Sequence, residues 1–244
     1  HEYLIEEDIN KSVADKFLTW GWSDKLDKKT RPFNAFQFNL INQKKLKKKI
    51  NKKNKILVCY HFQSKFSSKV SSIGKTNHDR LYKLYQLKEL TNNIRKKSDI
   101  VVRYSKQTSK MFNVRFDENI FHNQISFDYT NKLLTDVLND FKLVIHDNDT
   151  TTFLTSMYFN IPTILILNPK FETFRVSAKK IYKNLERNNI IFYDPASAAK
   201  FINKNEKNFE KWWYSKKLQN LREKFCKKFV RYSDKPVQDL LNQI

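Results

Sequence analysis

Polar side chains follow two apolar runs near the middle of the chain, residues 142–145 and 163–167. Short runs that are apolar throughout are typical of strands buried on both faces of a parallel sheet. In open α/β sheets, ligands bind at the carboxyl ends of such strands. The candidate binding residues are therefore the polar ones at these two ends: His146, Asn148, Thr150, Thr151, Thr152, Asn168, Glu172 and Arg175.

These residue types suit the binding of an anion. Asp149 or Thr150 is placed to cap a helix that begins at the threonines, and the free N–H groups and positive dipole end of such a helix attract negative charge. Hydroxyl and guanidinium groups add further donors for a phosphate. A strand, a cap and a helix also occur in α/β proteins without a ligand at this place. The density of polar groups at two neighbouring strand ends is what favours a binding site.

Arg103 lies in another apolar run, residues 100–104. A charge inside a buried strand is costly unless it is paired. Arg103 therefore either pairs with an internal carboxylate or faces the crevice and binds an anion. We favour the second interpretation because the guanidinium fork suits phosphate and carboxylate groups.

Two histidines at strand ends, His61 and His146, are the candidates for a general base. Each is equally well explained as a structural histidine. Asp147 and Asp149 have the Asp-x-Asp spacing of a metal-bound nucleotide site, but their place just before a helix favours capping. Two cysteines are too few for a disulfide framework or a zinc site. We therefore expect no metal.

The other periodic segments complete an α/β pattern. Further strands are expected at residues 56–60, 100–104, 125–129 and 190–193, and helices at 79–97, 130–140, 174–187, from 195 onward, and at 206–230. The aromatic residues of the last helix have spacings of three and four, which is typical of a stripe packed on the domain. The sequence thus predicts a Rossmann-like parallel sheet with helices on both faces and a helical C-terminal extension. No Gly-x-Gly-x-x-Gly fingerprint follows the strand at 56–60.

We divide the chain into three parts. Residues 1–33 are expected to be the tail of a preceding N-terminal domain, residues 34–55 a basic linker, and residues 56–244 the Rossmann-like domain. Trp20 and Trp22 in the first part either stack on a sugar or base or pack against the neighbouring domain, and we favour packing. A membrane-surface patch is the alternative for the lysines of the linker.

The chain is strongly basic, with 47 Lys and Arg against 25 Asp and Glu and a net charge of +22. Because only nine of the basic residues are arginine, and asparagine and isoleucine are abundant, much of this charge reflects the codon use of an AT-rich genome. It still attracts anionic partners such as a nucleotide, a phospholipid surface or an acidic glycan. We expect a cytoplasmic protein, with a peripheral position at the inner membrane as the alternative.

Several segments resemble a bacterial family of transferases of surface-carbohydrate biosynthesis. The similar segments are VIHDNDTTTFLTSMYFNIPTILILNPKFETFRVSAKKIYKNL, IIFYDPASAAKFIN, FEKWWYSKKLQNLREKFCKKFV, IVVRYSK and KSVADKFLTWGW. The likeness covers most of the chain and is weakest between residues 34 and 99. The sequence departs from the family's pattern at Phe171 and at Thr155, where the family has an acid.

The resemblance implies a metal-independent glycosyltransferase of GT-B type, distantly similar to capsule Kdo transferases and to CDP-glycerol glycerophosphotransferases. Such an enzyme transfers a hexosyl, Kdo-like or related group from a nucleotide-activated donor, with CMP and CDP as candidate carriers, to a surface polysaccharide or glycolipid. It uses no cofactor. Residues 56–244 would be the donor-binding half, and the general base would come from the N-terminal half.

Carried over by position, the resemblance also implies roles for single residues. Thr150, Thr151 and Thr152 would meet the donor phosphate, Arg103 and Arg175 would balance its charge, and Glu172 would bind the ribose or sugar. The implied partners are a nucleotide-activated sugar, a glycan or lipid-linked acceptor and an anionic inner-membrane surface, with no nucleic acid. Two other functions stay open: a non-catalytic or degenerate transferase half that acts as an assembly partner, and a basic nucleic-acid-binding domain.

Overall fold

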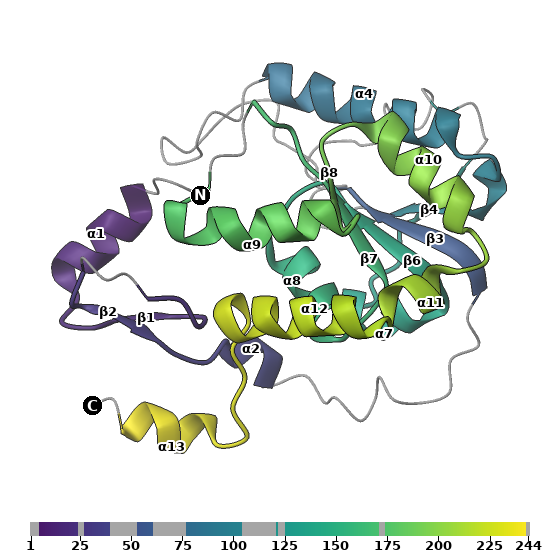
Figure 1. The fold of residues 1–244 in the computed structure, drawn as a ribbon. Coiled ribbons are helices and arrows are strands. Elements are labelled where there is room, and N and C mark those ends of the chain that lie inside the picture. The colour runs from purple at the N-terminus through teal and green to yellow at the C-terminus, as the bar shows by residue number, and fades with distance from the viewer. Residues whose placement is uncertain are drawn as a thin grey trace.

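A six-stranded parallel sheet forms the centre of the protein, which we describe from a computed structural model (Figure 1). The structure describes residues 5–23, 27–39, 53–60, 77–103, 121, 125–170 and 174–242. The strands of the sheet lie in the order β5-β4-β3-β6-β7-β8. Their bounds are β3 Lys53–Cys59, β4 Ile100–Arg103, β5 Ser126–Asp128, β6 Phe141–His146, β7 Thr163–Ile166 and β8 Ile191–Phe192. Each of the six overlaps a segment that the sequence predicts as a strand.

The strand order reverses between β3 and β6. The chain builds outward from β3 to β5 on one side and then from β6 to β8 on the other, as in the Rossmann fold. At this switch point Cys59, the last residue of β3, is in register with His146, the last residue of β6. The crevice expected for a ligand therefore opens beyond these two residues.

Helices cover both faces of the sheet, as the sequence predicts (Figure 1). Ile56 and Val58 of β3 point to the face that packs against α4 (Asn77–Asn93) and α10 (Pro195–Asn205). Leu57 and Cys59 point to the opposite face, because side chains alternate along a strand. That face is covered by α7 (Leu134–Val137), α8 (Thr151–Tyr158), α9 (Val176–Arg187) and α12 (Lys216–Phe229). None of the helices in the described ranges combines the length and apolarity needed to cross a membrane.

Two predicted helices are shorter or divided in the structure. The helix expected at 130–140 is confined to α7 and the 3-10 turn that follows it, η3 (Leu138–Asp140). Another 3-10 turn, η1 (Lys97–Asp99), precedes β4. The residues before α7 are not helical. There Asp128 accepts a hydrogen bond from the Thr130 backbone, and Arg103 donates one to the Lys132 carbonyl. The helix expected at 206–230 consists of α11 (Phe209–Trp213) and α12, separated by Tyr214 and by Ser215, the N-cap of α12.

The C-terminal aromatic stripe is buried as predicted. Phe209 packs against the face with α4 and α10, while Trp213 and Phe225 pack on the other. The indole of Trp213 donates to the side-chain oxygen of Asn160 at 2.8 Å. A short helix that the sequence pattern did not predict, α13 (Pro236–Leu241), follows α12 and has a proline at its start.

The N-terminal segment lies against the end of α12. It contains α1 (Ile5–Val13), the strands β1 (Phe17–Thr19) and β2 (Thr30–Pro32), which pair in parallel, and α2 (Phe36–Asn39). The Trp20 carbonyl accepts a hydrogen bond from the Arg231 backbone N–H, and the Ala35 N–H donates to the Arg231 carbonyl, both at 2.8 Å. Phe38 is fully buried in the core formed by α8, α9 and α12. This segment therefore packs on the α/β unit itself.

Gly21 allows this close approach. Its φ is +126°, a conformation that residues with a side chain rarely adopt, and a Cβ there would lie 2.8 Å from the Lys227 carbonyl oxygen and 2.9 Å from the Arg231 Cβ. The carbonyl oxygen belongs to the backbone and the Cβ is bonded directly to it, so neither atom can move aside cheaply. Gly21 is thus needed for both its torsion angle and its lack of a side chain.

We expect Gly21→Ala to lower the free energy of unfolding by about 2 kcal/mol, because it combines backbone strain with a steric clash. Urea denaturation followed by tryptophan fluorescence measures this change. Ser23→Ala in the same exposed turn is the control and should leave stability within about 0.5 kcal/mol of wild type. Equal stability of the two variants would contradict the role assigned to Gly21.

Candidate functional site

A cavity of about 350 Å³ lies beside the N-terminus of α8. It is walled by the loop after β6, by the first two turns of α9, by Phe229 of α12 and by the N-terminal segment. Its lining residues are Glu7, Trp20, Trp22, Asp149, Thr150, Leu154, Phe174, Arg175, Ser177, Ala178, Tyr182 and Phe229. We call this cavity the α8 pocket. It brings together two of the residues predicted to bind a donor, Thr150 and Arg175.

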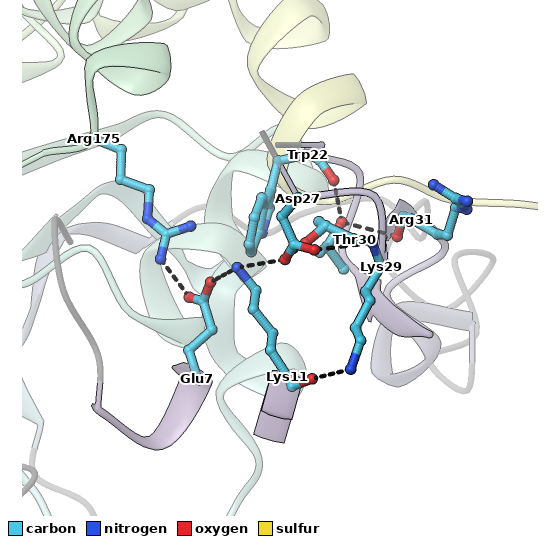
Figure 2. A network of polar contacts seen from close by, with 9 residues as sticks. Glu7, Lys11, Trp22, Asp27, Lys29, Thr30, Arg31 and Arg175 are labelled. Carbon is cyan, nitrogen blue, oxygen red and sulfur yellow. Dashed lines mark hydrogen bonds and ion pairs between the residues drawn. The ribbon is translucent and has the colours of Figure 1, made fainter. Parts of the chain in front are cut away.

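Arg175, the N-cap residue of α9, is held by residues far away in the sequence (Figure 2). Its Nη2 donates to Glu7 Oε2 at 2.7 Å, and the guanidinium lies 5.0 Å from the centre of the Trp22 ring. Both partners come from the N-terminal segment. The guanidinium is thus oriented by an ion pair and a cation–π contact at the wall of the pocket.

Glu7 belongs to a larger network of charges (Figure 2). Lys11 Nζ lies 2.6 Å from Glu7 Oε1 and 3.3 Å from Asp27 Oδ2. Asp27 also accepts hydrogen bonds from the Thr30 hydroxyl and the Lys29 backbone, and these bonds, with the Lys11 charge, lower its pKa to about 2. The network ties α1 to the turn before β2 and so places Glu7 beside Arg175.

Thr150, one of the two residues predicted to start α8, occupies its N-cap position. Its hydroxyl donates to Asn148 Oδ1 at 2.5 Å, and its backbone N–H approaches the same oxygen at 3.3 Å. The Thr150 side chain makes no cap bond to the first N–H groups of the helix. The Tyr182 hydroxyl donates to Asp149 Oδ2 at 3.0 Å and holds the loop in place. The start of α8 therefore presents backbone donors next to the pocket, where an anion is favoured.

Of the described residues predicted at these two strand ends, the others do not line the pocket. Thr151 is exposed and Thr152 is half-buried on the first turn of α8. Asn168 is buried at the end of β7, where its Oδ1 accepts from the Lys170 backbone and its Nδ2 has no partner among the described residues. Glu172 and His61 lie outside the described residues.

His146 has no exposed surface. Its Nε2 is 2.9 Å from Ser156 Oγ, its ring packs edge-on against Phe153, and its Nδ1 has no partner among the described residues. Burial lowers its pKa to about 3, so the ring is neutral at physiological pH. In this position the imidazole cannot reach a substrate in the α8 pocket, and we assign it a structural role below α8.

Arg103 pairs with an internal carboxylate, the interpretation that we did not favour. Its Nη1 donates to Asp128 Oδ2 at 2.8 Å, because the two residues are register partners at the ends of β4 and β5. Burial opposes the charge of Asp128, but hydrogen bonds from Thr130 and the Arg103 charge hold its pKa below the usual value. Arg103 lies beyond β3 from His146 and does not line the α8 pocket.

The switch point holds a second ion pair that the sequence did not reveal. Lys83 of α4 is almost fully buried, and its Nζ lies 3.5 Å from Asp147 Oδ2. Cys59, at the end of β3, is also buried, and desolvation raises the pKa of its thiol to about 12, which makes the thiol inert. Within the described ranges, no group of three His, Cys, Asp or Glu side chains is placed to hold a metal ion.

Sequence reasoning missed Glu7 and Tyr182 as pocket residues, and for Trp22 it favoured packing over contact with a ligand. Tyr182 is the seventh residue of α9, and its apolar spacing with Ala178 and Leu185 predicts burial but not a bond to Asp149. Glu7 precedes Arg175 by 168 positions, and no local pattern connects them. The paired tryptophans near Gly21 were the one local signal of a binding wall.

We expect the neutral state of His146 to make stability depend on pH. Its pKa is lower in the folded chain than the value of 6.5 in the unfolded chain, so the unfolded state takes up a proton first as the pH falls. The contribution of His146 to the free energy of unfolding is thus fully present above pH 6.5 and decreases below it, by about 2 kcal/mol between pH 7 and 5. Urea denaturation of wild type and His146→Gln at both pH values measures this term.

The glutamine variant removes the titrating group while keeping a donor near Ser156. Between pH 7 and 5 the variant should therefore lose about 2 kcal/mol less stability than the wild type. Any contribution from the other histidines is common to both proteins and cancels in the difference. An identical pH dependence in wild type and variant would contradict the buried neutral histidine.

Comparison with solved structures returns the wall teichoic acid polymerase TagF. One TagF structure has a TM-score of 0.45 and 12% sequence identity, and the match covers 98% of this chain and 59% of that one. A histidine-to-asparagine variant of TagF soaked with CDPG for 30 minutes gives a TM-score of 0.45 at 12% identity, with 98% and 58% covered. The chain thus spans less than two thirds of the TagF chains.

No curated protein matches the sequence significantly. Family comparison is decisive, because the match extends over residues 1–244 and hence over the entire chain. The protein belongs to the LIC12162 family of transferases.

Proposed function

We propose that this chain forms the donor-binding half of a GT-B-type glycosyltransferase, which transfers a sugar from a nucleotide-activated donor to a cell-surface glycan or glycolipid. Membership of a transferase family supports group transfer as the reaction class. The Rossmann-like strand order supports ligand binding at the carboxyl ends of the strands. The donor, the acceptor and the GT-B arrangement belong to the proposal.

The observation that carries the proposal is that Arg175 and the N-terminus of α8 share one pocket. A guanidinium, the Thr150 hydroxyl and the first backbone N–H groups of a helix are the donors that a phosphate group recognises. The volume of about 350 Å³ suits part of a nucleotide sugar, and Trp20 and Trp22 offer aromatic surface to a base or sugar.

These groups also suit the chemistry of transfer. When the sugar leaves a nucleotide donor, negative charge grows on the departing phosphate. Donors that are already oriented, such as Arg175 between Glu7 and Trp22, stabilise that charge without reorganising. The acceptor hydroxyl must lose a proton to a catalytic base. The described residues that line the pocket include two carboxylates, Glu7 and Asp149. Both are engaged in bonds to other residues of the protein. We assign the base to neither.

We expect Arg175→Ala to weaken nucleotide binding by about ten- to a hundredfold, the usual effect of losing one charge-assisted hydrogen bond to phosphate. Isothermal titration calorimetry with CMP, CDP, UDP and GDP would measure these affinities and identify the preferred nucleobase. Arg187→Ala is the matched control, because Arg187 is exposed at the other end of the same helix. It should leave every affinity unchanged.

A further variant separates direct binding from a structural effect. Glu7→Gln breaks the same ion pair but leaves the Arg175 guanidinium and removes a competing negative charge, so nucleotide affinity should stay the same or rise. If Glu7→Gln and Arg175→Ala weaken binding equally, Arg175 acts only by holding the N-terminal segment. If no nucleotide binds the wild-type protein, the proposed function is wrong.

A further inference from the structure

A second and larger cavity of about 1080 Å³ adjoins the α8 pocket. The two cavities share Trp22, Arg175 and Ser177 as lining residues. The larger one runs between the N-terminal segment and the C-terminal half of α12, where Gly21 lies against the helix. We call it the α12 groove. A molecule in this groove would lie beside one in the α8 pocket, with Arg175 between them.

The lining of the α12 groove is strongly basic. It contains six cations, Lys11, Arg175, Lys224, Lys227, Lys228 and Arg231, and one carboxylate, Asp8. Lys11 and Arg175 have Glu7 as an internal partner. Lys224 and Lys227 are exposed and form no ion pair within the described part of the chain. The groove therefore carries a positive charge that the protein itself does not neutralise.

The cations of α12 are spaced for a linear partner. Lys224 and Lys227 are three residues apart, which places them on one face of α12, about one turn or 5 Å apart along the axis. Arg231 follows the end of the helix and lines the same groove. Cations at the end of a helix also stabilise its dipole, which accounts for Lys227 and Lys228 in the last turn. That effect fades within one turn. It explains neither Lys224 nor the convergence of Lys11 and Arg175 on the same groove.

We propose that the α12 groove binds the acceptor as an anionic glycan, a chain whose repeat units bear carboxylate or phosphate groups. This inference rests on the proposed function, because the groove opens onto the pocket assigned to the donor. The row of cations matches repeated negative charges, whereas the donor contributes only the phosphates of one nucleotide. The guanidinium groups of Arg175 and Arg231 in the lining suit carboxylate and phosphate alike.

Fluorescence anisotropy with labelled oligosaccharides of equal length would test the proposal. The probes are a hyaluronan oligosaccharide with carboxylates, a phosphorylated mannan oligosaccharide, neutral dextran and single-stranded oligo(dT). We expect the two acidic glycans to bind, more weakly as salt rises, and dextran not to bind. The tighter of the two acidic probes identifies the charged group.

The test variant is Lys224→Gln with Lys227→Gln, and its control is Lys216→Gln with Lys217→Gln at the other end of α12. All four lysines are exposed, and both double variants lose the same net charge. We expect the first to bind the acidic glycan about tenfold more weakly, equivalent to about 1.4 kcal/mol, and the second less than twofold. Both should keep wild-type unfolding temperatures and nucleotide affinity.

Each result decides between the two proposals. Equal loss of glycan binding in the two double variants would overturn the groove, because only overall charge would then matter. Binding of oligo(dT) as tight as that of the acidic glycans would also overturn it, in favour of a nucleic-acid surface. If nucleotides bind and no acidic glycan does, this inference alone is wrong. If acidic glycans bind at Lys224 and Lys227 but no nucleotide binds, the groove stands as a glycan site and the donor assignment falls.

Discussion

The contact between Gly21 and the end of α12 determines the walls of both cavities. Two backbone hydrogen bonds join Arg231 to Trp20 and Ala35, and Gly21 between the tryptophans has no Cβ to hold the chains apart. Trp20 and Trp22 then face the α8 pocket, while Lys227 and Arg231 face the α12 groove. A single close approach of backbone to backbone therefore positions an aromatic wall on one side and a basic wall on the other.

The sheet and its crevice could be predicted from the sequence because their signals are local. A strand buried on both faces reads as a continuous apolar run, and the run from Leu143 to Ile145 is followed at once by polar residues. The helix start near Thr150 could be predicted from residue types that favour N-cap positions, although the Thr150 side chain makes no cap bond in the structure. The partners of the charged residues could not be predicted in this way. Arg103 meets Asp128 only through strand register, and Arg175 meets Glu7 only after the N-terminal segment has folded back on α9.

The contrast between local sequence signals and tertiary contacts also explains how the net charge of +22 should be interpreted. Composition suggested that many of the lysines reflect codon use. The fold nevertheless gathers Lys11, Lys224, Lys227 and Lys228 around one groove, because α1 and the end of α12 converge on the Gly21 turn. A compositional bias of this kind supplies many cations without a specific purpose, and the tertiary structure then determines which of them act together. Sequence statistics alone cannot reveal this, since the groove combines residues from both ends of the chain.

The ion pair between Glu7 and Arg175 is compatible with ligand binding because Glu7 has a second partner. A phosphate that engages Arg175 competes with Glu7, and leaving a buried carboxylate without a counter-charge would be strongly unfavourable. Lys11, at 2.6 Å from Glu7 Oε1, remains in place to balance that carboxylate. The guanidinium can therefore be shared with an incoming anion while Glu7 stays neutralised. Arg175 is thus oriented in the absence of ligand and available in its presence, and this combination is what a preorganised anion site requires.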